Sequence, residues 1–79
     1  MRVTIRLHAT LRKYVPAGAD GNAVCVDVPD GATVVEAIER LGVPRSHAKI
    51  MVSGDRHLEP TTVLCDGQEV DLYPPLAGG

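Results

Sequence analysis

Residues 33–42 have helical periodicity, and this segment restricts the possible folds of the 79-residue chain more than any other feature. Apolar residues recur there at helical spacing, namely Val34, Ala37, Ile38 and Leu41. Thr33 and Glu36 have the spacing of a capping box, and Gly42 marks where the helix should end. A single amphipathic helix must bury its apolar face against another layer, so the rest of the chain has to supply a sheet.

Alternation of apolar and polar residues predicts the strands of that sheet. The segments are 2–7, 24–28, 50–52, 56–58 and 69–73. A short helical turn is expected at 8–14, and Pro16 and Gly18 should end it. The order is therefore a hairpin, a helix, two short strands and a last strand.

This order predicts an α+β fold of the β-grasp, or ubiquitin-like, type, a roll in which a mixed sheet packs on one main helix. The first and last strands can be parallel neighbours because a long crossover separates them. Their outward faces would carry Arg2 and Arg6 beside Asp27, Glu69 and Asp71. Cross-strand pairing on a solvated face is the simpler interpretation of these charges, and a partner-docking surface is the alternative.

Length and composition exclude several classes of function. A chain of 79 residues can bury one compact core but has no room for a deep cleft. The net charge of −2 and the absence of Phe and Trp argue against nucleic-acid binding. No apolar run approaches the roughly 20 residues of a membrane span. Two cysteines and no signal-peptide pattern lead us to expect a cytoplasmic protein.

The last six residues are expected to form a flexible tail, 74–79, after a globular domain at 1–73. They are Pro74, Pro75, Leu76, Ala77, Gly78 and Gly79. Two glycines without Cβ atoms would let an extended backbone pass through a narrow channel. Prolines fix φ and favour an extended path, and six residues at about 3.3 Å each reach roughly 20 Å. We therefore expect the Gly79 carboxylate to be the functional group, with Leu76 filling a partner's pocket.

Other candidate sites are weak. Cys25 and Cys65 lie far apart with no C-x-x-C spacing, so we expect ordinary thiols and no metal site. The three histidines, His8, His47 and His57, are expected to be polar surface residues. The chain has neither Gly-x-x-x-x-Gly-Lys-Ser/Thr nor Gly-x-Gly-x-x-Gly, so it should not bind ATP phosphates itself.

The sequence resembles the MoaD/ThiS family of ubiquitin-like sulfur carriers over essentially its whole length. The matching segments are 11–12, 28–34, 66–70 and 74–79. The Pro-Pro pair and the length are most similar to the small subunit of molybdopterin synthase. This chain departs from the family in having no aromatic residue at Leu7 or His8.

The resemblance implies a protein cosubstrate, or a non-catalytic subunit, and not an enzyme. An ATP-dependent activating enzyme would adenylate the Gly79 carboxylate, and a sulfur source would convert it to a thiocarboxylate that donates sulfur, most plausibly in molybdopterin biosynthesis. The implied partners are this adenylating enzyme and a larger synthase subunit or another sulfur-transfer enzyme. No cofactor is expected on the chain, since the partner uses the ATP.

Alternatives stay open at this point. The adenylate could be captured by a lysine amine, which would make the chain a ubiquitin-like modifier conjugated through Gly79. The sulfur could instead serve thiamine synthesis or tRNA thiolation. A plain β-grasp interaction module is the third hypothesis, and undiminished activity after removal of Gly78 and Gly79 would favour it.

Overall fold

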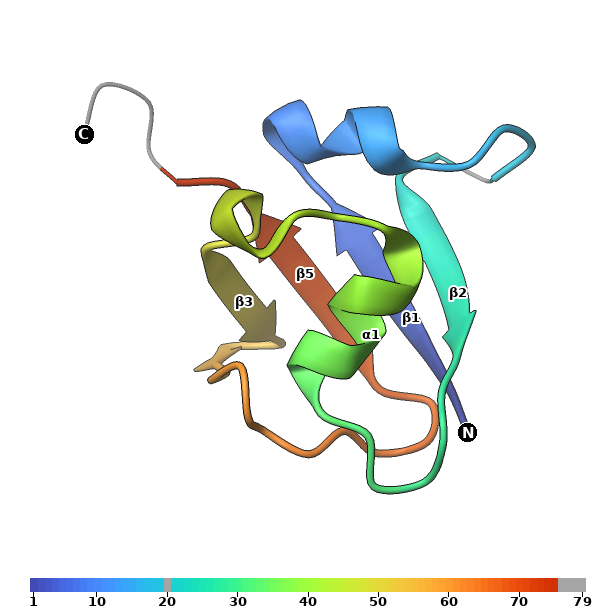
Figure 1. Ribbon diagram of the computed structural model, residues 1–79, viewed down its shortest axis with the longest axis vertical. Helices are drawn as coiled ribbons and strands as arrows, with labels where there is room; N and C mark the ends of the chain where they lie inside the picture. Colours follow the sequence, from blue (N-terminus) through green and yellow to red (C-terminus); the bar gives the residue numbers. More distant parts are fainter. Residues whose placement is uncertain (20, 76–79) are drawn as a thin grey trace.

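The structure, a computed structural model, describes residues 1–19 and 21–75. In this part of the chain five strands form one mixed sheet in the order β2-β1-β5-β3-β4. The helix α1 lies across one face of the sheet (Figure 1). The predicted β-grasp roll is therefore confirmed.

The helices and strands follow the expected order. The strands are β1 (Arg2–Leu7), β2 (Ala23–Asp27), β3 (Ile50–Ser53), β4 (Arg56–His57) and β5 (Glu69–Tyr73). The helix α1 spans Val34–Leu41, and two 3-10 segments are η1 (Ala9–Tyr14) and η2 (Arg45–His47). The segment η2 was not predicted, because its three residues carry no apolar periodicity.

The strand register places the last strand, β5, at the centre of the sheet. The strand β1 is antiparallel to β2 and parallel to β5, with Leu7 opposite Leu72. The strand β3 is antiparallel to β5, with Met51 opposite Leu72. The predicted parallel pairing of the first and last strands is thus confirmed, and β5 is flanked by a strand on either side.

The core lies between α1 and the sheet, as the two periodicities predict. The sheet contributes Val3, Ile5, Leu7, Val26, Met51, Val70 and Leu72, and the helix contributes Val34, Ala37 and Ile38. Connecting segments add Leu11, Val28, Ala32, Val43, Ala48 and Leu64. All of these residues belong to one core cluster.

The start of α1 has the predicted capping box. The Glu36 amide donates to Thr33 Oγ1 at 3.4 Å, and the Thr33 amide donates to Glu36 Oε1 at 3.3 Å. The segment before β5 completes the cap, since the Val34 amide donates to the Thr62 carbonyl at 3.0 Å. At the other end Gly42 has a φ of 78°, a left-handed conformation that favours glycine.

Replacing Thr33 with Ala should lower the free energy of unfolding by about 1 kcal/mol, because a helix N-cap residue contributes this much on average. Urea unfolding followed by circular dichroism measures the change. The matched control is Thr61→Ala, since Thr61 is exposed and lies outside the helix. Equal unfolding midpoints for the two variants would contradict the role of the capping box.

Candidate functional site

The predicted tail begins directly at the end of β5. Pro74 is half-buried and Pro75 is exposed. They lead the chain out at the upper end of the sheet (Figure 1). Leu76, Ala77, Gly78 and Gly79 lie outside the described residues, so their roles, and the division into 1–73 and 74–79, stay predictions. What the structure does define is the base from which the tail leaves.

Hydrogen bonds from residues next to both neighbouring strands fix this base. The Lys49 amide donates to the Tyr73 carbonyl at 3.1 Å, and the His8 amide donates to the Leu72 carbonyl at 3.1 Å. One bond comes from the segment before β3 and the other from the segment after β1. The last two residues of β5 are therefore held on both sides, and Pro74 starts from a defined position.

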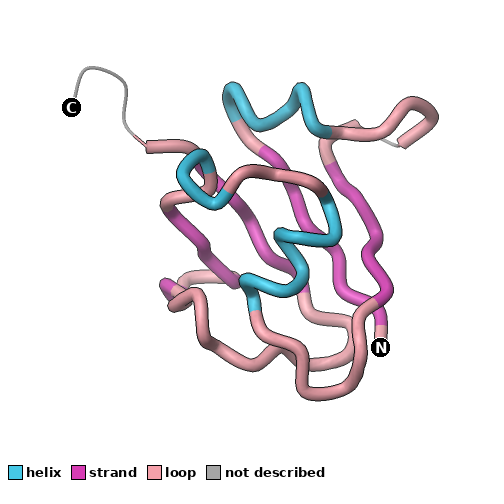
Figure 2. The backbone as a smooth tube through the Cα atoms, viewed as in Figure 1, coloured by secondary structure: helices cyan, strands magenta, loops and turns pink. Residues whose placement is uncertain are grey.

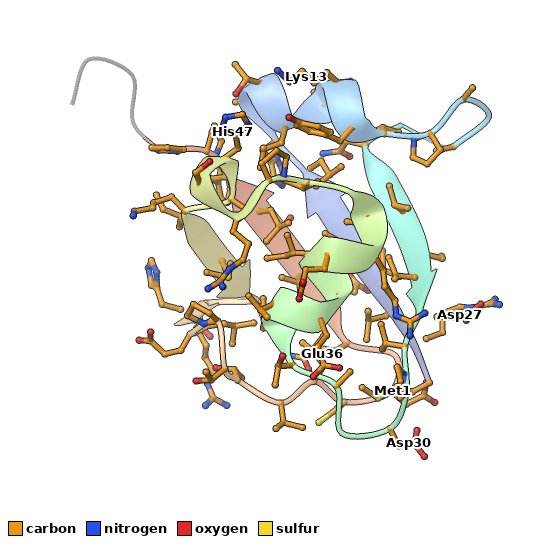
Figure 3. The ribbon with its side chains drawn as sticks, in the orientation of Figure 1. Met1, Lys13, Asp27, Asp30, Glu36 and His47 are labelled. Carbon is orange, nitrogen blue, oxygen red and sulfur yellow. The ribbon has the colours of Figure 1, made fainter. Side chains whose placement is uncertain are left out.

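The two 3-10 segments lie at the same end of the molecule as the tail base (Figure 2). They are joined by a hydrogen bond between Tyr14 Oη and His47 Nδ1, at 3.2 Å. A cleft of about 310 Å³ lies beside this bond. Its lining residues are Thr10, Leu11, Lys13, Tyr14, His47, Pro74 and Pro75. Lys13 and His47 thus border the same cleft as the first two residues of the tail (Figure 3).

An aromatic stack lies on the other side of the tail base, on the outer face of the sheet. The rings of His8 and Tyr73 are 4.4 Å apart between centroids, with an interplanar angle of 9°. His8 Nε2 also contacts Asp71 Oδ1 at 2.7 Å. The expectation that His8 is merely a polar surface residue was therefore incomplete. The register of β1 against β5 could have revealed it, because His8 and Tyr73 each follow one member of the Leu7–Leu72 pair.

The rest of the outer face carries the predicted ion pairs. Arg2 Nε lies 3.1 Å from Asp27 Oδ1, and Arg6 bonds Glu69 across the parallel pair of strands. Arg6 also approaches Asp71 Oδ2 at 3.6 Å. A hydrogen bond from Arg2, and then its charge, lowers the pKa of Asp27 below its usual 3.8. Such exposed pairs contribute little to stability, but they give Arg2 and Arg6 acidic partners on this face.

Replacing Arg2 with Gln should raise the pKa of Asp27 toward 3.8, because the hydrogen bond and the charge that favour the carboxylate are both lost. Carboxyl-carbon NMR titration measures this value. In the wild type the stabilisation by this pair is present above pH 3.8 and is lost as the pH falls through the lowered pKa. Arg6→Gln is the matched control, since Arg6 does not bond Asp27; an Asp27 pKa that moves equally in both variants would contradict the assignment.

The described residues offer little support for a metal site, a special role of the thiols or a membrane-spanning helix. Across 1–19 and 21–75, no group of three His, Cys, Asp or Glu side chains could hold a metal ion. Cys25 and Cys65 are exposed free thiols. No described helix has both the length and the hydropathy needed to cross a bilayer. The base of the tail therefore remains the candidate site.

The five-stranded mixed sheet and its single main helix define a ubiquitin-like fold. Comparison with known families makes this specific: the chain belongs to the Mut7-C ubiquitin family, whose model matches residues 1–77. No curated protein is similar enough in sequence to match. The predicted likeness to ubiquitin-like proteins is thus confirmed at the level of family and fold.

Solved structures show the same fold over the whole chain. SAMP1 from Haloferax volcanii is 22% identical with a TM-score of 0.72, and the match covers 100% of both chains. A putative molybdopterin converting factor, subunit 1, from Pyrococcus furiosus is 21% identical with a TM-score of 0.70, covering 95% of this chain and 98% of that one. A ubiquitin-like protein from Caldiarchaeum subterraneum is 18% identical, with a TM-score of 0.52 and coverage of 99% and 100%.

Proposed function

We propose that this protein is a sulfur carrier whose Gly79 carboxylate is adenylated by an ATP-dependent activating enzyme and then converted to a thiocarboxylate. The observation that carries the proposal is the position of the tail base. Pro74 and Pro75 follow the central strand β5 directly, and hydrogen bonds on both sides hold the end of that strand. In this proposal the held end of β5 supports the segment that leads to Gly78 and Gly79.

The chemistry follows from the weakness of a carboxylate as an electrophile. A Gly79 oxygen attacks the α-phosphate of ATP, pyrophosphate leaves, and the product is an acyl-adenylate. A sulfur nucleophile then attacks the acyl carbon and AMP departs, which leaves sulfur in place of one oxygen. The chain contributes position: docking of the domain places one reactive group next to an acceptor and raises its effective concentration.

The catalytic groups and the ATP site belong to the partners in this proposal. One partner is the adenylating enzyme, and the second is a larger synthase subunit or another sulfur-transfer enzyme. Both would act in the cytoplasm, where ATP is supplied. The fold likeness to the Pyrococcus furiosus putative molybdopterin converting factor supports molybdopterin synthesis as the destination of the sulfur; thiamine synthesis or tRNA thiolation would use the same thiocarboxylate.

A second candidate function is conjugation to proteins. It is favoured by the fold likeness to a Haloferax volcanii protein described as small archaeal modifier protein 1. The same acyl-adenylate would be attacked by a lysine amine, which would give an isopeptide bond through Gly79 and release AMP. The two functions differ only in the nucleophile that attacks the acyl-adenylate, which is sulfur in the first and a lysine amine in the second.

Intact-mass spectrometry tests the proposal. The native protein should end at Gly79, and incubation with the adenylating enzyme of its own organism, ATP and sulfide should add the mass difference between sulfur and oxygen. Omission of ATP is the control. A native chain that continues past Gly79, or an end left unmodified by the complete mixture, would overturn the proposal. Tryptic remnants of residues 57–79 on lysines of other proteins would favour conjugation, because no Lys or Arg follows Arg56.

A further inference from the structure

We propose that the end of the domain around the tail base is a basic docking surface for an acidic surface of the enzyme that takes up the tail. We call this surface the basic collar and define it as Arg12, Lys13, Arg45 and Lys49. The inference rests on the proposed function and adds the chemistry of the partner. It is carried by the distribution of charge over the fold.

The charges of the chain are strongly segregated. The net charge is −2, with ten Asp and Glu residues in all. Yet neither 8–19 nor 42–54 contains an acidic residue, and these two segments carry the whole basic collar. They hold η1, η2 and all of β3. The fold brings η1 and η2 to the end from which the tail leaves (Figure 2).

The four cations of the basic collar are available for a partner. All four residues are exposed. Among the residues that the structure describes, none of the four forms an ion pair, whereas Arg2 and Arg6 are paired on the outer face. Among the described residues Arg40 and Arg56 also form no ion pair, but four of the six unpaired Lys and Arg side chains belong to the basic collar.

One side of the basic collar borders the 310 Å³ cleft. Lys13 Nζ lies 5.4 Å from the centre of the Tyr14 ring, a contact that steadies the ammonium without cancelling its charge. His47 and the Thr10 hydroxyl line the same cleft, as do Pro74 and Pro75. The cleft thus offers an acidic side chain of the partner a cation and hydrogen-bonding groups directly beside the tail.

The other side of the basic collar borders a larger groove of about 550 Å³ between α1 and β3. Arg45 and Lys49 line this groove above apolar residues that include Ile38 and Met51. Glu59 is the acidic residue among its lining residues. Lys13 thus borders the cleft at the tail base, and Lys49, whose amide donates to the Tyr73 carbonyl, lies on the groove side, as expected if the partner's tail channel is rimmed with carboxylates.

A protein partner fits this charge distribution better than a nucleic acid does. The remainder of the surface is acidic, so a long phosphate backbone that extended past the basic collar would be repelled. A protein surface that meets only the tail end avoids that repulsion. Complementary charge at the rim of an interface mainly accelerates association, and the effect falls with ionic strength.

The test uses ATP–pyrophosphate exchange by the adenylating enzyme of the same organism, with the full chain as the variable substrate. The double variant Lys13→Glu/Arg45→Glu should raise KM at low salt by about tenfold or more, in the range of electrostatic steering, with kcat changed by less than about twofold. The matched control is Arg56→Glu in β4, because Arg56 pairs with Ser53 at the end of β3 remote from Tyr73. It should leave KM unchanged.

The outcomes are distinct. If the wild type supports no exchange, the proposed function fails and the inference with it. If the wild type is active and the double variant and the control have equal KM values, the inference alone is overturned. Thermal melting checks that both variants fold, and Lys13→Gln/Arg45→Gln should show a smaller rise in KM than the double reversal. Tight binding of labelled RNA that the double reversal abolishes would overturn the inference in favour of a nucleic-acid partner.

Discussion

A chain that lacks Gly79 should fold normally and should no longer be adenylated at a measurable rate. Deletion of one extended residue moves the terminal carboxylate back by about 3.3 Å. Misplacement of a reacting group by about 1 Å can lower a rate by roughly 100-fold, so we expect at least this loss in kcat/KM. Pyrophosphate exchange measures activity, and thermal melting should show no change because Gly79 follows the sheet and its core.

The variant Gly79→Ala distinguishes two requirements: the length of the tail and the width of the partner's channel. It restores the length of the tail but adds a Cβ atom at the reacting end. If reach alone limits the reaction, this variant should recover most of the activity; if the channel admits only glycine, it should be as inactive as the deletion. Normal exchange by the chain without Gly79 would show that this carboxylate is not the reacting group.

The sequence was most informative where short-range chemistry decides the structure. The capping box of Thr33 and Glu36 and the stop at Gly42 located α1, because the groups that end a helix lie within one turn of it. The alternation in 2–7 and 69–73 located the two central strands. Each of these signals is complete within a few residues, so no tertiary information was needed.

Features that depend on packing between distant segments were not predictable. The segment η2 and the burial of Ala48 depend on contacts with the rest of the fold and have no local pattern. Ala9 has a φ of 52°, a left-handed conformation that glycine adopts more easily, so the sequence gives no warning of it. In both cases the tertiary fold overrides local preference.

The candidate site likewise has one part that the sequence predicts and another part that only the fold reveals. The diglycine motif indicated the chemistry of the tail, but it carried no information about the surface around the tail base. The basic collar arises only when η1 and η2 meet across Tyr14 and His47. Similarly, the stack of His8 on Tyr73 needs the parallel register of β1 and β5. The reacting group therefore stays a prediction from the sequence, and the fold was needed to find what surrounds its support.

Replacing Leu72 with Ala should destabilise the domain by about 2–5 kcal/mol. Leu72 is 0% exposed and lies opposite both Leu7 and Met51, so truncation leaves a cavity at the centre of the sheet. A domain of this size has about 4–12 kcal/mol of total stability, so the variant should lose a large share of it and, at the low end of this range, should unfold. Urea unfolding followed by circular dichroism measures the loss.

The matched control is Val63→Ala, because Val63 is 58% exposed and its truncation creates no cavity. It should change stability by less than about 0.5 kcal/mol. The variant Leu72→Met conserves volume and should lose less than about 1.5 kcal/mol. Since β5 supports the tail, adenylation at a fixed temperature should follow the folded fraction: retained by Leu72→Met and lost by Leu72→Ala. Full adenylation of an unfolded Leu72→Ala chain would mean that the partner recognises the tail without the domain.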